Sequence, residues 1–168
     1  MHVRIGIFCD ARTAPWLQAD QDPEPLVDDL NIELGYLYGS PLGTHVDPRI
    51  TRAVVGSRVP QVWLTRDGRR VSTINLTGNF LLLAGSDGAS WVSAAPSAAD
   101  RFNGLRLDAH RVGADLRGPG SQFLEAVDLP SQGALLIRPD GFVAWRTSEL
   151  HPQPEAALHE ALRRSLGH

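Results

Sequence analysis

Three tryptophans and two tyrosines are the side chains in this sequence best suited to bind a flat organic ligand. Trp63, Trp91 and Trp145 could line one pocket, because aromatic faces stack on aromatic rings. Large aromatic side chains also fill the cores of ordinary domains, so a purely structural role stays open for all three. Tyr36 and Tyr38 share one face of an extended segment, which favours packing on a neighbouring surface over catalysis. These five residues are the candidate ligand cleft or interface.

Three arginines lie in or beside segments expected to be strands. A guanidinium can clamp an anion such as a carboxylate, and Arg58, Arg138 and Arg146 are candidates for that role. Charged side chains at strand edges also remain in water and discourage pairing with other chains. The sequence leaves both interpretations open.

The motifs of thiol, nucleotide and serine chemistry are absent. Thiol–disulfide exchange needs a low-pKa thiol with a nearby partner, usually in Cys-x-x-Cys, and the chain has one cysteine, Cys9. The dinucleotide turn G-x-G-x-x-G does not occur, and a P-loop is excluded because the chain contains no lysine. In residues 39–43, GSPLG, the serine comes one place too early for a nucleophile elbow.

The six histidines show no metal-binding pattern. His2 and His168 are terminal, and His151 and His159 are eight residues apart instead of the four that place two ligands on one helical turn. His45 lies in a long loop, where an imidazole can bind loop backbone. We therefore expect no catalytic, cofactor-binding or metal-binding residue in this chain.

Composition and charge indicate an ordinary globular protein. The 168 residues suit one domain with a full core, with 42% hydrophobic and 21% charged residues. A formal net charge of −3 and scattered basic residues argue against a nucleic-acid partner. No segment approaches the ~20 apolar residues of a membrane helix, so we expect no membrane association. A single thiol cannot form an internal disulfide, which favours a reducing compartment, and we expect a cytoplasmic protein.

Turn-forming residues divide the chain near Pro60. Residues 1–59 are expected to be an irregular extension with a strand over 2–8, a short helix over 25–31 and a long connection over 39–60. Residues 60–168 are expected to form the folded domain. Its predicted elements are strands at 61–64, 71–76, 80–84, 105–112, 135–137 and 142–145, a helix capped by Asp87 or Ser90 and kinked or started at Pro96, and helices at 121–127 and 154–167.

The order of these elements predicts an α/β fold. Residues 80–84 form a continuous apolar run typical of a strand buried on both faces. A crossover and a second strand follow, then a hairpin at Pro139-Asp140-Gly141 and a closing helix with Leu158, Leu162 and Leu166 on one face. This is a thioredoxin-like arrangement, with a central mixed sheet flanked by helices.

Six segments in order resemble a known family. They are LGYLYGSP at 34–41, GSRVPQVWL at 56–64, DGRRVSTINLTGNFLLLAG at 67–85, WVSAA at 91–95, DAHRVG at 108–113 and LIRPDGFVAWR at 136–146. Together they resemble the C-terminal region of FAD-dependent aromatic-ring hydroxylases, the phenol and chlorophenol hydroxylase-like monooxygenases and their relatives acting on polyketides. Two details depart from that pattern: Asn75 stands where an acidic residue is expected, and the turn at residues 77–80 differs.

The resemblance implies a thioredoxin-like domain without redox cysteines. In the family, FAD, NAD(P)H and the phenolic substrate are handled by preceding domains, so no flavin-contacting or catalytic residue carries over to this chain. The family's C-terminal domain packs on the flavoprotein body and contributes to dimer contacts in some members. The leading hypothesis is a non-catalytic association module whose partner is a flavoprotein or a second copy. The alternatives are a stand-alone protein that binds small aromatic ligands and an accessory subunit of a separate flavoprotein monooxygenase.

Overall fold

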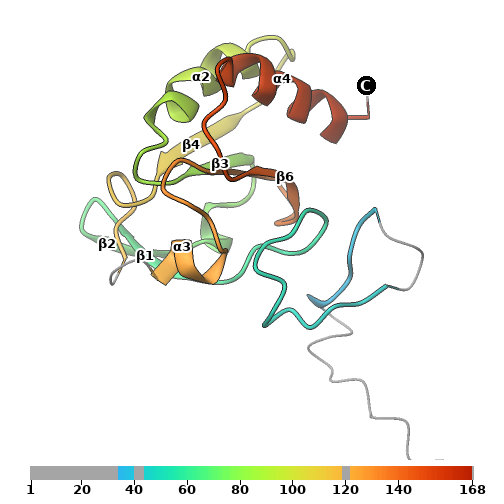
Figure 1. The fold of residues 1–168 in the computed structure, drawn as a ribbon, viewed down its shortest axis with the longest axis vertical. Helices are drawn as coiled ribbons and strands as arrows, with labels where there is room; N and C mark the ends of the chain where they lie inside the picture. The colour runs from blue at the N-terminus through green and yellow to red at the C-terminus, as the bar shows by residue number, and fades with distance from the viewer. Residues whose placement is uncertain (1–33, 40–43, 119–121, 168) are drawn as a thin grey trace, which may run out of the picture.

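The computed structural model of the protein describes residues 34–39, 44–118 and 122–167. In this part of the chain, a four-stranded mixed sheet lies between two layers, with a separate two-stranded hairpin in one of them (Figure 1). The expected α/β, thioredoxin-like architecture is confirmed. The predicted strand at 2–8, the predicted helix at 25–31 and Cys9 lie outside the described residues.

The sheet is built around one apolar strand. β3 (Phe80–Ala84) is buried at all five residues, as the run FLLLA predicts. It pairs in parallel with β4 (Leu107–Arg111) and antiparallel with β5 (Ala134–Ile137). β5 then pairs antiparallel with β6 (Val143–Thr147), which gives the strand order β4-β3-β5-β6.

Alternation along β3 supplies two separate cores. Leu81 and Leu83 belong to the cluster on one face, whereas Phe80, Leu82 and Ala84 belong to the cluster on the other. β5 alternates in the same way, so the two central strands together join the two layers of the domain.

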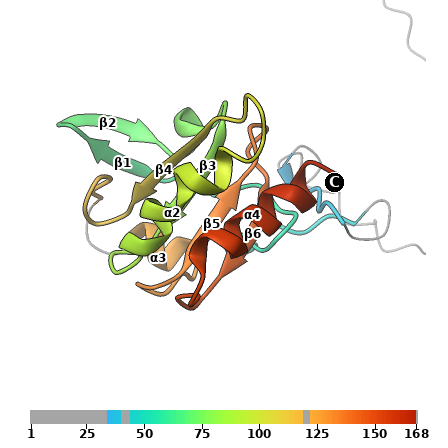
Figure 2. The same cartoon turned by 90° about the horizontal axis from the view of Figure 1, so that it is seen from above.

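Two helices cover one face and smaller elements cover the other. α2 (Ala89–Ala99) and α4 (Pro154–Ser165) lie over the face of Leu82, and α3 (Gln122–Ala126) lies on the opposite side together with the hairpin (Figures 1 and 2). None of the helices in the described ranges is both long and apolar enough to cross a membrane.

The start of α2 differs from the sequence-based prediction. Gly88 occupies the N-cap, and no side chain caps the helix, so neither Asp87 nor Ser90 has the predicted role. The helix also does not begin at Pro96 but continues through it, and the Asp100 N–H donates to the Pro96 carbonyl at 2.9 Å. Packing of Trp91 in the core holds the first turn without a cap.

The hairpin of β1 (Trp63–Arg66) and β2 (Arg69–Ser72) turns at Asp67-Gly68, as predicted. Both turn residues have positive φ, 49° and 75°, which is the type I′ geometry favoured in two-residue hairpins.

The predicted strand over 71–76 is too long. Residues Ile74–Leu76 form a short 3₁₀ helix, η2. Two hydroxyls explain the change: the Asn75 N–H donates to Ser72 Oγ at 3.2 Å, and the Val62 N–H donates to Thr73 Oγ1 at 3.0 Å. Such local side-chain bonds compete with the strand ladder for backbone groups.

The C-terminal elements follow the predicted order. Gly141, with φ of 85°, closes the turn between β5 and β6 by donating its N–H to the Arg138 carbonyl at 2.9 Å. In α4, Leu158 and Leu162 are fully buried as predicted. Leu166, predicted on the same face, lies beyond the helix end and is 38% exposed.

The connection before β1 is fastened to the end of the sheet. The Val143 N–H donates to the Ser57 carbonyl at 2.8 Å, and the Val59 N–H donates to the Gly141 carbonyl at 3.0 Å. Residues 57–59 therefore act as a short extra strand beside the start of β6.

Arg146 ties this connection to the loop after α3. Its guanidinium donates to the carbonyls of Arg52 and Ala53 at 2.9 and 3.3 Å, and to those of Val127 and Asp128 at 3.2 and 2.7 Å. Arginine has the five N–H donors that this arrangement needs. Arg146 therefore has neither of the two roles considered from the sequence, which were an anion clamp and a free charge at a strand edge.

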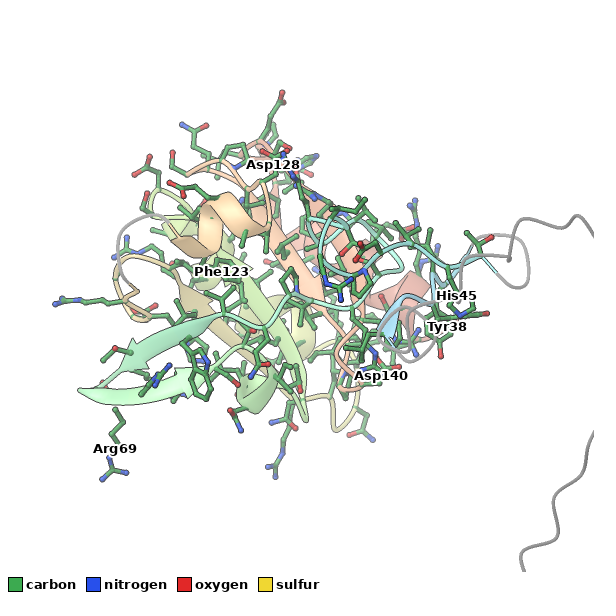
Figure 3. The ribbon with its side chains drawn as sticks, turned by 90° about the horizontal axis from the view of Figure 1, so that it is seen from below. Tyr38, His45, Arg69, Phe123, Asp128 and Asp140 are labelled. Carbon is green, nitrogen blue, oxygen red and sulfur yellow. The ribbon has the colours of Figure 1, made fainter. Side chains whose placement is uncertain are left out.

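Replacing Arg146 by lysine should lower the free energy of unfolding by about 1–3 kcal/mol, since one ammonium cannot satisfy carbonyls in two loops. Urea denaturation followed by tryptophan fluorescence measures the change. Arg69→Lys is the control, because Arg69 points away from the protein at the hairpin (Figure 3) and its change should stay within about 0.5 kcal/mol. Equal losses in the two variants would contradict the bridging role of Arg146.

Candidate interaction surface

Four rings form a contiguous aromatic stack at one end of the sheet. Tyr38 meets Phe142 edge to face with 4.6 Å between ring centroids, Tyr36 lies 5.0 Å from Tyr38, and His45 lies 5.8 Å from Tyr36. Figure 3 shows Tyr38 and His45 together at this end of the molecule. We call Tyr36, Tyr38, His45 and Phe142 the aromatic stack. It brings together the two tyrosines singled out from the sequence with His45 and Phe142, which were not expected to join them.

Two arginines lie over the aromatic stack. The Arg58 guanidinium is 4.5 Å from the centroid of Phe142, and the Arg138 guanidinium is 4.9 Å from that of Tyr38. Each contact places a cation over the negative face of a ring. Arg138 also forms an ion pair with Asp140 at 2.5 Å. The guanidinium groups of Arg58 and Arg138 are therefore held in place by aromatic rings. The sequence had also allowed them to be charges at strand edges that remain in water.

Gly56 holds the aromatic stack against the sheet. Its carbonyl accepts from the Tyr38 N–H at 2.9 Å, and its own N–H donates to the Val143 carbonyl at 2.8 Å. Its φ is 91°, and a Cβ here would collide with the Tyr38 carbonyl oxygen. Only glycine combines the left-handed backbone with this close approach.

An apolar groove of about 470 Å³ adjoins the aromatic stack. Its apolar walls come from the connection, η2 and α3, with contributions from Leu34, Pro48, Val59, Pro60, Ile74 and Ala126. Arg49, Arg52 and Arg58 add positive charge to the same groove. The volume lies within the ~300–1,000 Å³ typical of small-molecule sites.

The three tryptophans do not share this groove or any one cleft in the described structure. Trp91 and Trp145 meet at 5.4 Å between centroids, and Trp91 is fully buried with its Nε1–H donating to the Gln132 carbonyl at 3.1 Å. Trp63 lies on the hairpin, on the opposite side of the sheet, 44% exposed beneath the Arg70 guanidinium at 4.2 Å.

Histidines and carboxylates do not gather into a metal site within residues 34–39, 44–118 and 122–167. His159 stacks on Phe102 at 5.0 Å, and His110 lies on β4. Partial burial, aided by the nearby Arg66, lowers the pKa of His110 below its usual value. That shift favours the neutral imidazole, but His110 lies on β4, at the edge of the sheet opposite β6.

The two glycines in the turn from β3 into α2 pack tightly against neighbouring protein atoms. A Cβ on Gly85 would collide with the carbonyls of Pro130 and Ser131, and one on Gly88 would come within 2.8 Å of the Ala84 Cβ. In a dinucleotide site the glycines make room for the pyrophosphate. Here the Cβ positions of both glycines face protein atoms, so close packing of the turn accounts for the two glycines.

The groove was not predicted, and its origin explains why. Its residues come from segments far apart in the sequence, between Leu34 and Gly141. The one available signal was the length of the connection over 39–60, since long loops are often functional.

A protein-family model described as "Aromatic-ring hydroxylase, C-terminal" matches residues 52–168. The chain is 42% identical over 167 residues to 4-methyl-5-nitrocatechol 5-monooxygenase of Burkholderia sp, covering 90% of this chain and 30% of that protein. It is 48% identical over 114 residues to tetracenomycin A2 monooxygenase-dioxygenase of Streptomyces glaucescens, covering 66% of this chain and 20% of that protein. The chain therefore spans less than a third of the length of these relatives.

A solved structure shows the same arrangement. The crystal structure of a ternary complex of aklavinone-11 hydroxylase with FAD and aklavinone superimposes with a TM-score of 0.78 at 36% identity. The match covers 84% of this chain and 28% of that one.

Replacing Gly56 by alanine should detach residues 34–39 from the sheet. We expect a loss of about 3 kcal/mol in unfolding free energy, since a positive φ costs ~1–2 kcal/mol and overpacking adds a similar amount. Gly104→Ala is the matched control, because Gly104 has φ of 78° with nothing within 4 Å of its added Cβ. Its expected loss is about 1 kcal/mol. Thermal unfolding of both variants measures the difference, and equal losses would rule out the close approach as the cause.

Proposed function

We infer the function from one premise: the chain belongs to the aromatic-ring hydroxylase family and corresponds to its C-terminal region. We propose that this region is a non-catalytic association module without its own flavin site. FAD and NAD(P)H then bind to another part of the hydroxylase, and hydroxylation of an aromatic substrate takes place there.

The observation that supports this proposal best is the filled turn between β3 and α2. Gly85 and Gly88 occupy the position in the fold where a glycine turn could receive a phosphate, but each packs directly against protein atoms. The structure of aklavinone-11 hydroxylase contains FAD, and this chain matches only 28% of that protein.

Exposed apolar side chains on the connection support an association role. Ile50 is 67% exposed, Val54 41% and Val55 50%, and Val55 lines a shallow pocket together with Tyr38. Large apolar side chains gathered at a surface are typical of protein contacts. We propose that this surface, with the aromatic stack beside it, contacts a flavoprotein or a second copy in the cytoplasm.

Mixed with FAD, NADPH and a phenol, the purified chain should retain no flavin after gel filtration and should not accelerate NADPH oxidation. Flavin absorbance and NADPH consumption measure the two outcomes. The intact 4-methyl-5-nitrocatechol 5-monooxygenase serves as the positive control for the assay. Stoichiometric flavin on this chain, with NADPH consumption that depends on the phenol, would overturn the proposal.

The isolated chain should self-associate weakly through its exposed apolar residues. The average mass measured by light scattering should rise with concentration, and Val55→Asp should reduce that rise because it places a charge in the contact. Leu150→Asp is the control, since Leu150 is similarly exposed at 45% but lies before α4. A mass independent of concentration would rule out a second copy as the partner, and an equal response of both variants would contradict the assigned surface.

A further inference from the structure

We propose that the groove binds an organic carboxylate with a flat apolar body, a ligand site additional to the association surface. The groove combines apolar walls with charged groups of one dominant sign. Sites of this volume typically fix a small ligand through a few convergent polar groups. The inference stands on the groove alone and does not depend on the proposed function.

Arg58 is the group that selects a carboxylate. Its guanidinium is oriented by Phe142 at 4.5 Å, and its one hydrogen bond among the described residues is a long one, from Nη1 to the Asp140 carbonyl at 3.4 Å. Its Nε is buried and makes no hydrogen bond. The Nη donors that this fixed guanidinium leaves unused are available to bind a carboxylate.

The other charges of the groove are already compensated. Arg49 pairs with Asp47 at 3.6 Å and Arg52 with Asp128 at 4.0 Å. Asp140, the carboxylate among the lining residues, pairs with Arg138 outside the groove. Within the described part of the chain, Arg58 forms no ion pair with a carboxylate, unlike Arg49 and Arg52. One anionic head group therefore completes the charge balance, and a doubly charged phosphate would exceed it.

The apolar walls select the body of the ligand. Ile74 on η2 is 51% exposed, and Pro60 and Val59 lie on the connection beside Arg58. A flat hydrocarbon against these side chains removes apolar surface from water, which favours binding. A small acid such as acetate lacks this contribution, whereas an aryl carboxylate has both parts.

Calorimetric titration of the full 168-residue chain with 2-naphthoate tests the proposal. We expect saturable binding with one site per chain. The neutral analogue 2-naphthylmethanol should bind at least tenfold more weakly because it offers no charge to Arg58. Added salt should weaken naphthoate binding and leave the neutral analogue nearly unaffected.

Three variants locate the site. Arg58→Gln should remove the preference for naphthoate over the alcohol, with thermal unfolding confirming that the variant is folded. Ile74→Asp changes an exposed residue, so the fold should persist while naphthoate affinity falls at least tenfold. Leu150→Asp adds the same charge outside the groove and should leave the affinity unchanged.

Several results would overturn the assignment. Absence of saturable naphthoate binding would remove the site. Equal affinities for naphthoate and the alcohol would remove the role of Arg58. Unchanged affinity in folded Ile74→Asp, or an equal loss in Leu150→Asp, would place the binding elsewhere.

Discussion

The Arg146 guanidinium holds the part of the connection whose backbone conformation is least favourable. Arg52, Ala53 and Asp128 all have positive φ, between 44° and 54°, a backbone region that is uncommon for residues other than glycine. Such backbone persists only where surrounding contacts hold it. Arg146 supplies those contacts by donating to the carbonyls of all three residues and of Val127. This bridge acts together with the backbone hydrogen bonds of residues 56–59, and the two hold the connection and the aromatic stack at the end of the sheet.

Short sequence patterns correctly predicted the buried strand β3 and the turn between β1 and β2, because a few neighbouring residues determine each of them. The run at residues 80–84 is typical of a strand covered on both faces, and Asp67-Gly68 is typical of a two-residue turn. Prediction failed where a side-chain hydrogen bond or packing in the core determined the local structure. The hydroxyl of Ser72 diverted the chain into η2, and core packing of Trp91 replaced the expected helix cap.

The candidate surface was predictable only in part for a related reason. Tyr36 and Tyr38 are visible in the sequence because they are two residues apart and share a face. The residues that they contact cannot be read from the sequence, because Tyr38 packs on Phe142 and lies under Arg138, both about 100 residues later in the chain. Three tryptophans suggested one cleft, yet the sheet separates Trp63 from the other two. No periodicity in the sequence encodes which face of the sheet a distant ring will join.

The pairing of residues 57–59 with residues 141–143 has a consequence for the order of folding. These partners are separated by most of the domain, so the connection can be fastened only after the last hairpin has been made. During synthesis the connection leaves the ribosome before residues 141–143, so the junction between them stays open until the hairpin has emerged. Closure of the junction is then a late, long-range event, slow because distant segments must meet before their contacts stabilise each other.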